Sequence, residues 1–226
     1  MNNFLTGIDC LGLDRVLRRG TAEVLARRDG AMLLKDCVSG ACFLGCEDAA
    51  QGAELLECFL PADCRLLMVS DHALGKAAFA RFGFQELLEC RQTAYYGEAP
   101  TVGSELCVRT ADARDLPLLT ETYHLVEPEE LRRIVERKKL LLGYAQGVLV
   151  GFIGEHLEGS MGLLYVFPEF RRRGCASALE RLLIAKTLAE GYVPFGQVEK
   201  SNLASLALQE KLGMTISNNL ICWMWK

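Results

Sequence analysis

One stretch of this chain constrains its fold more than any other. In Leu163–Glu190 an apolar strand pattern runs into Arg171, Arg172, Arg173 and Gly174, and a helix pattern follows. The first turn of a helix carries backbone N–H groups that lack intrahelical partners, and a glycine lets an anion approach them. Arginine side chains add forked donors for phosphate oxygens. The stretch predicts an anion site, although the same letters also fit a basic surface loop that precedes a helix.

Strand and helix patterns alternate along the rest of the chain, which predicts an α/β fold class. Before residue 100 we expect helices over 3–19, 49–59 and 74–82 and strands over 31–35, 64–70 and 84–96. Gly97–Ser104 has no strong period and is the best linker candidate. After it we expect a strand over 105–110, two helices, a hairpin turning at Gln146 and Gly147, strands over 161–166 and 193–199, helices over 174–190 and 202–212, and a bent final strand. The predicted domains are therefore 1–100 and 104–226.

A weak internal likeness appears when the sequence is compared with itself. Ala78–Phe84 (AFARFGF) falls on Leu208–Met214 (LQEKLGM), an offset of 130 residues. The same offset sets the strand over 31–35 against 161–165 and the strand over 66–69 against 196–199. We interpret the chain as two related lobes, with chance matching of short apolar strands as the alternative. The arginine cluster has no counterpart in the first lobe.

Composition excludes several classes of protein. A formal net charge of −4 argues against a binder of nucleic acid that depends on a basic surface. The first residues lack the pattern of a secretory signal, and no apolar run reaches membrane-spanning length, so a cytoplasmic protein is expected. The ten cysteines form no CxxC pair and have no histidine at ligand spacing, which predicts no metal site. Only Cys175, beside the arginines, has an electropositive setting.

Two segments resemble the signatures of the GNAT superfamily of acyl-CoA N-acyltransferases, and particularly its branch with glycine N-acyltransferase C-terminal domains. Arg171, Gly174 and Ala176 match the first signature, an Arg or Gln followed by Gly and then Gly or Ala. The second signature is matched by Asn202, Ser205, Lys211, Leu212 and Gly213, with Met214 in place of the usual aromatic residue. The resemblance covers about residues 105–226.

The resemblance implies two GNAT-like lobes, each with a mixed, mostly antiparallel twisted sheet flanked by helices, of which the first lacks the pyrophosphate loop. In the second lobe a splayed strand pair would leave a cleft for acetyl-CoA or another acyl-CoA. The residues implied to bind the acyl-CoA are Tyr165, Val166, Arg171, Arg172, Arg173, Gly174, Cys175, Ala176, Asn202 and Ser205. The pyrophosphate would rest on the N–H groups of 173–176, and strand backbone near Val166 would hold the thioester carbonyl. Asn202 equally fits a plain helix N-cap.

The implied reaction is direct attack of a small-molecule amine on the thioester, which needs a base. We expect Glu158 first and Glu155 second, although either also fits a solvated loop carboxylate. The usual acid, a tyrosine, is replaced by Gln209, so water, Tyr165 or Tyr192 would protonate the thiolate. The acceptor pocket would lie at the bend between the two helices that follow residue 111, which carries Tyr123, His124, Glu127, Glu129 and Glu130. The alternative is a CoA-binding module without turnover, and a homodimer is possible.

Overall fold

The chain forms two compact units that do not follow the order of the sequence. The computed structural model describes residues 7–103 and 106–226. One unit contains the chain up to Ala94 together with Gln197–Glu210 and Met214–Lys226, and the other contains Tyr95–Gly196 and Lys211–Gly213. We call them the first and second unit. The predicted helix start at residue 3 and the predicted boundary at residues 104 and 105 lie outside the described residues.

The first unit is built on a mixed, mostly antiparallel sheet. Its strands are β1 (Ala22–Arg28), β2 (Ala31–Asp36), β3 (Cys42–Cys46), β4 (Leu66–Val69), β5 (Glu86–Ala94), β11 (Thr215–Ile216) and β12 (Ile221–Trp225). The order across the sheet is β1-β2-β3-β4-β12-β5, with β11 also paired to β5. Strands β3 and β4 pair in parallel. Its helices are α1 (Leu11–Arg18), α2 (Ala49–Phe59), α3 (His72–Arg81) and α7 (Leu203–Lys211), the last of which ends in the second unit.

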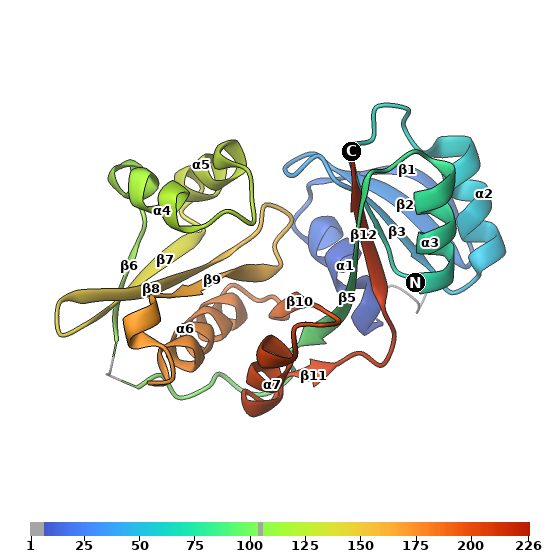
Figure 1. Ribbon diagram of the computed structural model, residues 1–226. Helices are drawn as coiled ribbons and strands as arrows, with labels where there is room; N and C mark the ends of the chain where they lie inside the picture. The colour runs from blue at the N-terminus through green and yellow to red at the C-terminus, as the bar shows by residue number, and fades with distance from the viewer. Residues whose placement is uncertain (1–6, 104–105) are drawn as a thin grey trace. The chain divides into compact units, whose positions relative to one another are not determined.

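Helices cover both faces of this sheet (Figure 1). Alternate residues of β2 and β3 face opposite sides, as the period of a strand requires. On one side Leu33 and Leu44 pack with Leu55 and Leu56 of α2. On the other side Leu34 and Phe43 pack with α1. Both faces are therefore apolar, which explains why β2 begins with a continuous hydrophobic run over 31–34.

The last strand of the chain lies in the middle of the first sheet. Trp223 of β12 is opposite Met68 of β4 and Leu88 of β5. Its ring also meets Phe43 edge to face, with centroids 5.4 Å apart. The predicted domains assign these C-terminal residues to 104–226, and the compact units therefore differ from that division. Strand pairing with β4 and β5 is the reason.

Replacement of Trp223 by alanine should destabilise the protein by about 3–5 kcal/mol, because it opens a cavity between two strands and Phe43. Trp225 provides the matched control, since it lies on the same strand but is 37% exposed, against 9% for Trp223. Trp225→Ala should cost about 1 kcal/mol or less. Denaturant unfolding of both variants measures the difference, and equal losses would contradict a buried β12.

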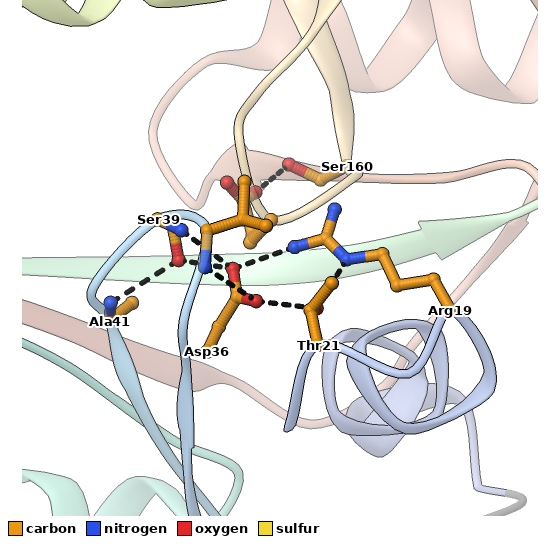
Figure 2. A network of polar contacts seen from close by, with 8 residues as sticks. Arg19, Thr21, Asp36, Ser39, Ala41 and Ser160 are labelled. Carbon is orange, nitrogen blue, oxygen red and sulfur yellow. Dashed lines mark hydrogen bonds and ion pairs between the residues drawn. The ribbon is translucent and has the colours of Figure 1, made fainter. Parts of the chain in front are cut away.

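A polar network closes the turn between β2 and β3 (Figure 2). The fully buried Asp36 carboxylate accepts hydrogen bonds from the Arg19 guanidinium at 2.6 Å and the Thr21 hydroxyl at 2.6 Å. The Ser39 hydroxyl and backbone N–H donate to the same group at 2.6 and 2.8 Å. Burial alone would raise the pKa of Asp36, but the hydrogen bonds from Ser39, Thr21 and Arg19 lower it on balance. A buried charge is tolerated here because its oxygens are satisfied.

Asp36→Asn should cost about 3 kcal/mol near neutral pH, because Arg19 loses its charged partner inside the protein. A lowered pKa means that the stabilisation is complete above the ordinary aspartate value of 3.8 and is lost as pH falls through the folded value. The gap in unfolding free energy between wild type and variant should therefore narrow below about pH 4. Asp14→Asn, which breaks a looser 3.8 Å pair with Arg18, is the control. A gap that stayed constant to pH 2 would contradict this account.

The strands of the second unit are also mixed and mostly antiparallel. Its strands run β10-β9-β8-β7-β6 across the sheet. They are β6 (Cys107–Thr110), β7 (Leu140–Ala145), β8 (Val148–Glu155), β9 (Met161–Val166) and the start of β10 (Phe195–Glu199). The helices α4 (Leu116–Thr122) and α5 (Pro128–Glu136) lie on one face of it, and α6 (Cys175–Ala189) lies on the other (Figure 1).

The predicted α/β class with mixed, mostly antiparallel sheets is confirmed, and several elements match closely. The hairpin turn has positive φ at Gln146 (49°) and Gly147 (80°), the geometry expected of a tight two-residue turn. The first hundred residues contain two strands that the sequence reading missed, β1 and β3. β1 was missed because its burial pattern shows no clean alternation, and β3 because glycine and cysteine interrupt a five-residue strand.

Candidate functional site

Strand β9 pairs in parallel with the start of β10. Their parallel pairing is registered at Gly196 and Met161 and at no further pair within the described residues. On its other side β9 contains a bulge, because Phe152 of β8 pairs with Tyr165 while Gly154 pairs with Gly162. Leu163, within the bulge, has a positive φ of 50°. The bulge disrupts the regular ladder between β8 and β9 and bends β9 locally.

The segment from Arg171 to Ala176, which we call the cradle, connects β9 to α6. Arg172 has φ 62° and Gly174 has φ 86°, so two left-handed residues flank Arg173. Left-handed residues in such close succession turn neighbouring backbone N–H groups toward one point and form an anion-binding concavity. Gly174 is the N-cap of α6 and supplies no side-chain hydrogen bond to the first turn. The amides of this turn are therefore open to an external acceptor.

Space and charge at the cradle fit a phosphate. A Cβ atom built on Gly174 would meet no atom within 4 Å. All three arginines are exposed. The Arg171 Nε donates to the carbonyl of Val166 at 3.0 Å, and its guanidinium lies 5.9 Å from the Tyr165 ring centroid. Arg171 therefore fixes the loop against β9, while Arg172 and Arg173 remain at the surface.

The remaining residues predicted to bind CoA are divided between the two units. Tyr165, Val166, Cys175 and Ala176 accompany the cradle in the second unit. The Tyr165 ring stacks on Phe152 with centroids 5.4 Å apart. Asn202 and Ser205 belong to the first unit, where the Asn202 Oδ1 accepts the Ser205 N–H at 3.1 Å. This bond is the N-cap of α7, the structural role that the sequence had left open for Asn202.

Both predicted bases are already engaged by neighbouring groups. Glu155 is buried and lies 3.2 Å from the Lys139 ammonium, which also pairs with Glu190. Glu158 is 7% exposed and accepts a hydrogen bond from the buried Ser160 hydroxyl. Glu158 lies in the turn before β9, which begins at Met161 as predicted. The catalytic assignment of the two carboxylates remains a prediction.

The sequence reading missed a histidine in this region as a functional residue. His156 directly follows β8, and its Nδ1 lies 3.7 Å from the Glu130 Oε1 of α5. The buried Tyr123, which follows α4, meets Phe152 of β8 edge to face. Two members of the predicted acceptor bend, Tyr123 and Glu130, are thus brought together with His156. Gly162 was the available signal, since a glycine inside a strand often marks close approach of another group.

A cavity of about 650 Å³ lies in the first unit. Its lining includes Glu47, Ser70 and Asp71, at the ends of β3 and β4 where α2 and α3 begin, and also Asp9. The residues lining it include no lysine or arginine. Three carboxylates make this cavity unsuitable for a pyrophosphate, in contrast to the cradle.

The cysteines offer little chemistry. All ten are free thiols, and burial is the main cause that raises the pKa of Cys10 and Cys90 to about 12. Such thiols are inert as nucleophiles at neutral pH. Cys175 is half-buried as the first residue of α6. Across residues 7–103 and 106–226, no group of three His, Cys, Asp or Glu side chains is arranged to hold a metal ion. The helices described there also include none with the length and apolarity needed to cross a membrane.

Comparison with known proteins points to one fold. The family model of FR47-like proteins matches residues 141–224. A Drosophila protein of known structure has a TM-score of 0.64 at 19% identity, covering 87% of this chain and 73% of that one. A GCN5-related N-acetyltransferase from Kribbella flavida gives 0.59 at 12% identity over 97% and 94% of the two chains. A putative GNAT-family acetyltransferase from Novosphingobium aromaticivorans gives 0.55 at 19% identity, covering 99% and 95%. No curated protein matches the sequence.

Proposed function

We propose that this chain, which has the fold of the GNAT superfamily of acyl-CoA N-acyltransferases, transfers an acyl group from acyl-CoA to a primary amine of a small molecule or amino acid. Acetyl is the default acyl group. The amine attacks directly while both substrates are bound. The cradle is the observation that carries this proposal: the start of α6 has no side-chain cap, and left-handed residues precede it beside exposed arginines.

Each part of the cradle has a role in binding. The N–H groups of Arg173, Gly174, Cys175 and Ala176 hold the pyrophosphate, and the helix dipole adds partial positive charge. Arg172 and Arg173 pair with phosphate oxygens. Acyl-CoA supplies the activated thioester carbon. From Val166 back to the start of β9 is about 15–20 Å at the usual rise per strand residue. An extended phosphopantetheine arm can follow that length toward the turn that carries Glu158 and His156.

The first unit is proposed to be a degenerate GNAT-like lobe. Its order β3, α2, β4, α3, β5 resembles β9, α6, β10, α7 and the final strands of the chain. Only Glu47 and Asp48 join β3 to α2, whereas residues 167–174 join β9 to α6. The 130-residue offset pairs β4 with β10 and α3 with α7. It also aligns β9 with β2, although the order of elements matches β9 to the next strand, β3. An insertion in the second lobe explains that mismatch.

A CoA-binding module without turnover is the second candidate. It is favoured by Gln209, which occupies the usual tyrosine position and is buried in α7. A glutamine cannot protonate a thiolate, although a thiolate leaves without help. Calorimetry with acetyl-CoA, followed by thiol release over a panel of amines and amino acids, separates the two functions. Tight binding without release would favour the module, and absence of binding would contradict both.

The double variant Arg172→Gln and Arg173→Gln should weaken acetyl-CoA binding by about ten- to a hundredfold, because two charge-assisted contacts to phosphate are lost. The loss should shrink at high salt, since these side chains are exposed. The control removes two other exposed cations, Arg65→Gln with Arg137→Gln, and keeps the same net charge. If both double variants bind acetyl-CoA equally, the effect is general electrostatics and the cradle is not the site. Calorimetry measures each dissociation constant.

A further inference from the structure

His156 packs directly on the backbone of β9. A Cβ atom built on Gly162 would lie 2.4 Å from the His156 Nε2 and 2.6 Å from its Cδ2. Only a glycine leaves room for the ring at that position. The backbone of His156 is fixed in its turn, because its N–H donates to Ser160 O at 2.8 Å and its carbonyl accepts the Gly159 N–H at 2.9 Å. The Nε2 edge therefore faces β9 in a defined place.

The other ring nitrogen faces a carboxylate. The His156 Nδ1 lies 3.7 Å from the Glu130 Oε1 of α5. A carboxylate on that side favours the proton on Nδ1 and leaves the Nε2 lone pair as the acceptor. The ring is thus oriented as a general base, with its carboxylate on the side away from β9.

The bulge brings Gly162 and Tyr165 to the same side of β9. Tyr165 stacks on Phe152, which meets Tyr123, and Glu130 lies close enough to Tyr123 to raise its pKa. The side chain of His156 is 28% exposed and that of Glu130 is 34% exposed, whereas Glu158 is 7% exposed. A solvent-reachable ring on the α5 side of β9 can meet an acceptor and return its proton to water. Buried Glu158 has no such direct route.

We propose that His156 is the general base of the acyl transfer and that Glu130 positions it. This inference rests on the proposed function. The amine N–H proton moves to Nε2 as the nitrogen lone pair forms the C–N bond. The C–S bond then breaks, the electron pair leaves on the CoA thiolate, and the imidazolium releases its proton to solvent. Glu130 neutralises the transient cation, and Glu158 assists from the turn.

The pH dependence follows from the charges around the ring. Burial lowers the pKa of His156, but the Glu130 and Glu158 carboxylates raise it above its ordinary value of 6.5 on balance. Tyr123 is neutral at these pH values, because burial and the charge of Glu130 raise its pKa to about 12. A base must be deprotonated, so kcat/KM should rise with pH through an apparent pKa above 6.5. Loss of the Glu130 carboxylate should move this rise of kcat/KM to lower pH.

The test uses the full chain with acetyl-CoA and the best acceptor from the amine panel. His156→Gln should lower kcat by about 10²–10⁴-fold with little change in acetyl-CoA affinity. Gly162→Ala should also lower kcat, because the added methyl displaces the ring. Glu130→Gln should move the rise of kcat/KM with pH to a lower pH. Glu136→Gln, on the same helix and paired with Arg132, is the control and should leave this rise in place.

Three outcomes decide the matter. A wild-type chain without turnover on any amine contradicts the acyltransferase itself. If His156→Gln turns over as fast as the wild type, His156 is not the general base, although the chain is still an acyltransferase. The same conclusion follows if Glu130→Gln leaves the pH profile of kcat/KM unchanged. Unchanged melting temperature and acetyl-CoA affinity in each variant separate a catalytic loss from misfolding. If His156 had only a structural role, the pH dependence of kcat/KM would not change when Glu130 is replaced.

Discussion

The first turn of α6 sets the main physical constraint on the second unit. Its backbone N–H groups need acceptors, and most helices meet that need with a Ser, Thr, Asp or Asn side chain at the N-cap. Here the N-cap is Gly174, which offers none. The helices α2 and α3 are capped conventionally, by Asp48 and Asp71. The uncapped start of α6 beside three arginines therefore departs from the other two helices, and the proposed phosphate site depends on that departure.

The sequence predicted the strand, loop and helix of the cradle well because they are adjacent in the chain, and the anion site itself stays a prediction. Strand, arginines, glycine and helix follow one another within a few residues, and both the backbone turn and the ligand depend on that order. Asn202 was predicted in the same way and does cap its helix. The order of residues around Asn202 does not indicate that this N-cap belongs to the first unit. The offset of 130 residues aligned β9 with β2 and not with β3 for a related reason. Extra residues between β9 and α6 change the offset of every element that precedes them.

Candidate bases were harder to predict, because they depend on contacts between distant elements. Alternation along an ideal strand places Glu158, Ser160 and Gly162 on one face, with Glu158 as the exposed member. The structure instead folds Glu158 back onto Ser160 in a turn and sets His156 over Gly162. The bulge at Leu163 then alters which residues face α5. Neither the turn nor the bulge has a distinct letter pattern, and Glu130 comes from a helix more than twenty residues earlier.

The first unit has a structural role that requires no bound ligand. Its acidic cavity is the opposite of a phosphate site, and its short β3–α2 connection leaves no room for a cradle. Its sheet nevertheless contains β12, paired on both edges between β4 and β5. The final strand, which was predicted for the segment 104–226, is therefore part of the core of the first unit, and that segment alone would lose both partners of the strand. The folded state of the C-terminal strand therefore depends on the first unit, whatever that unit binds.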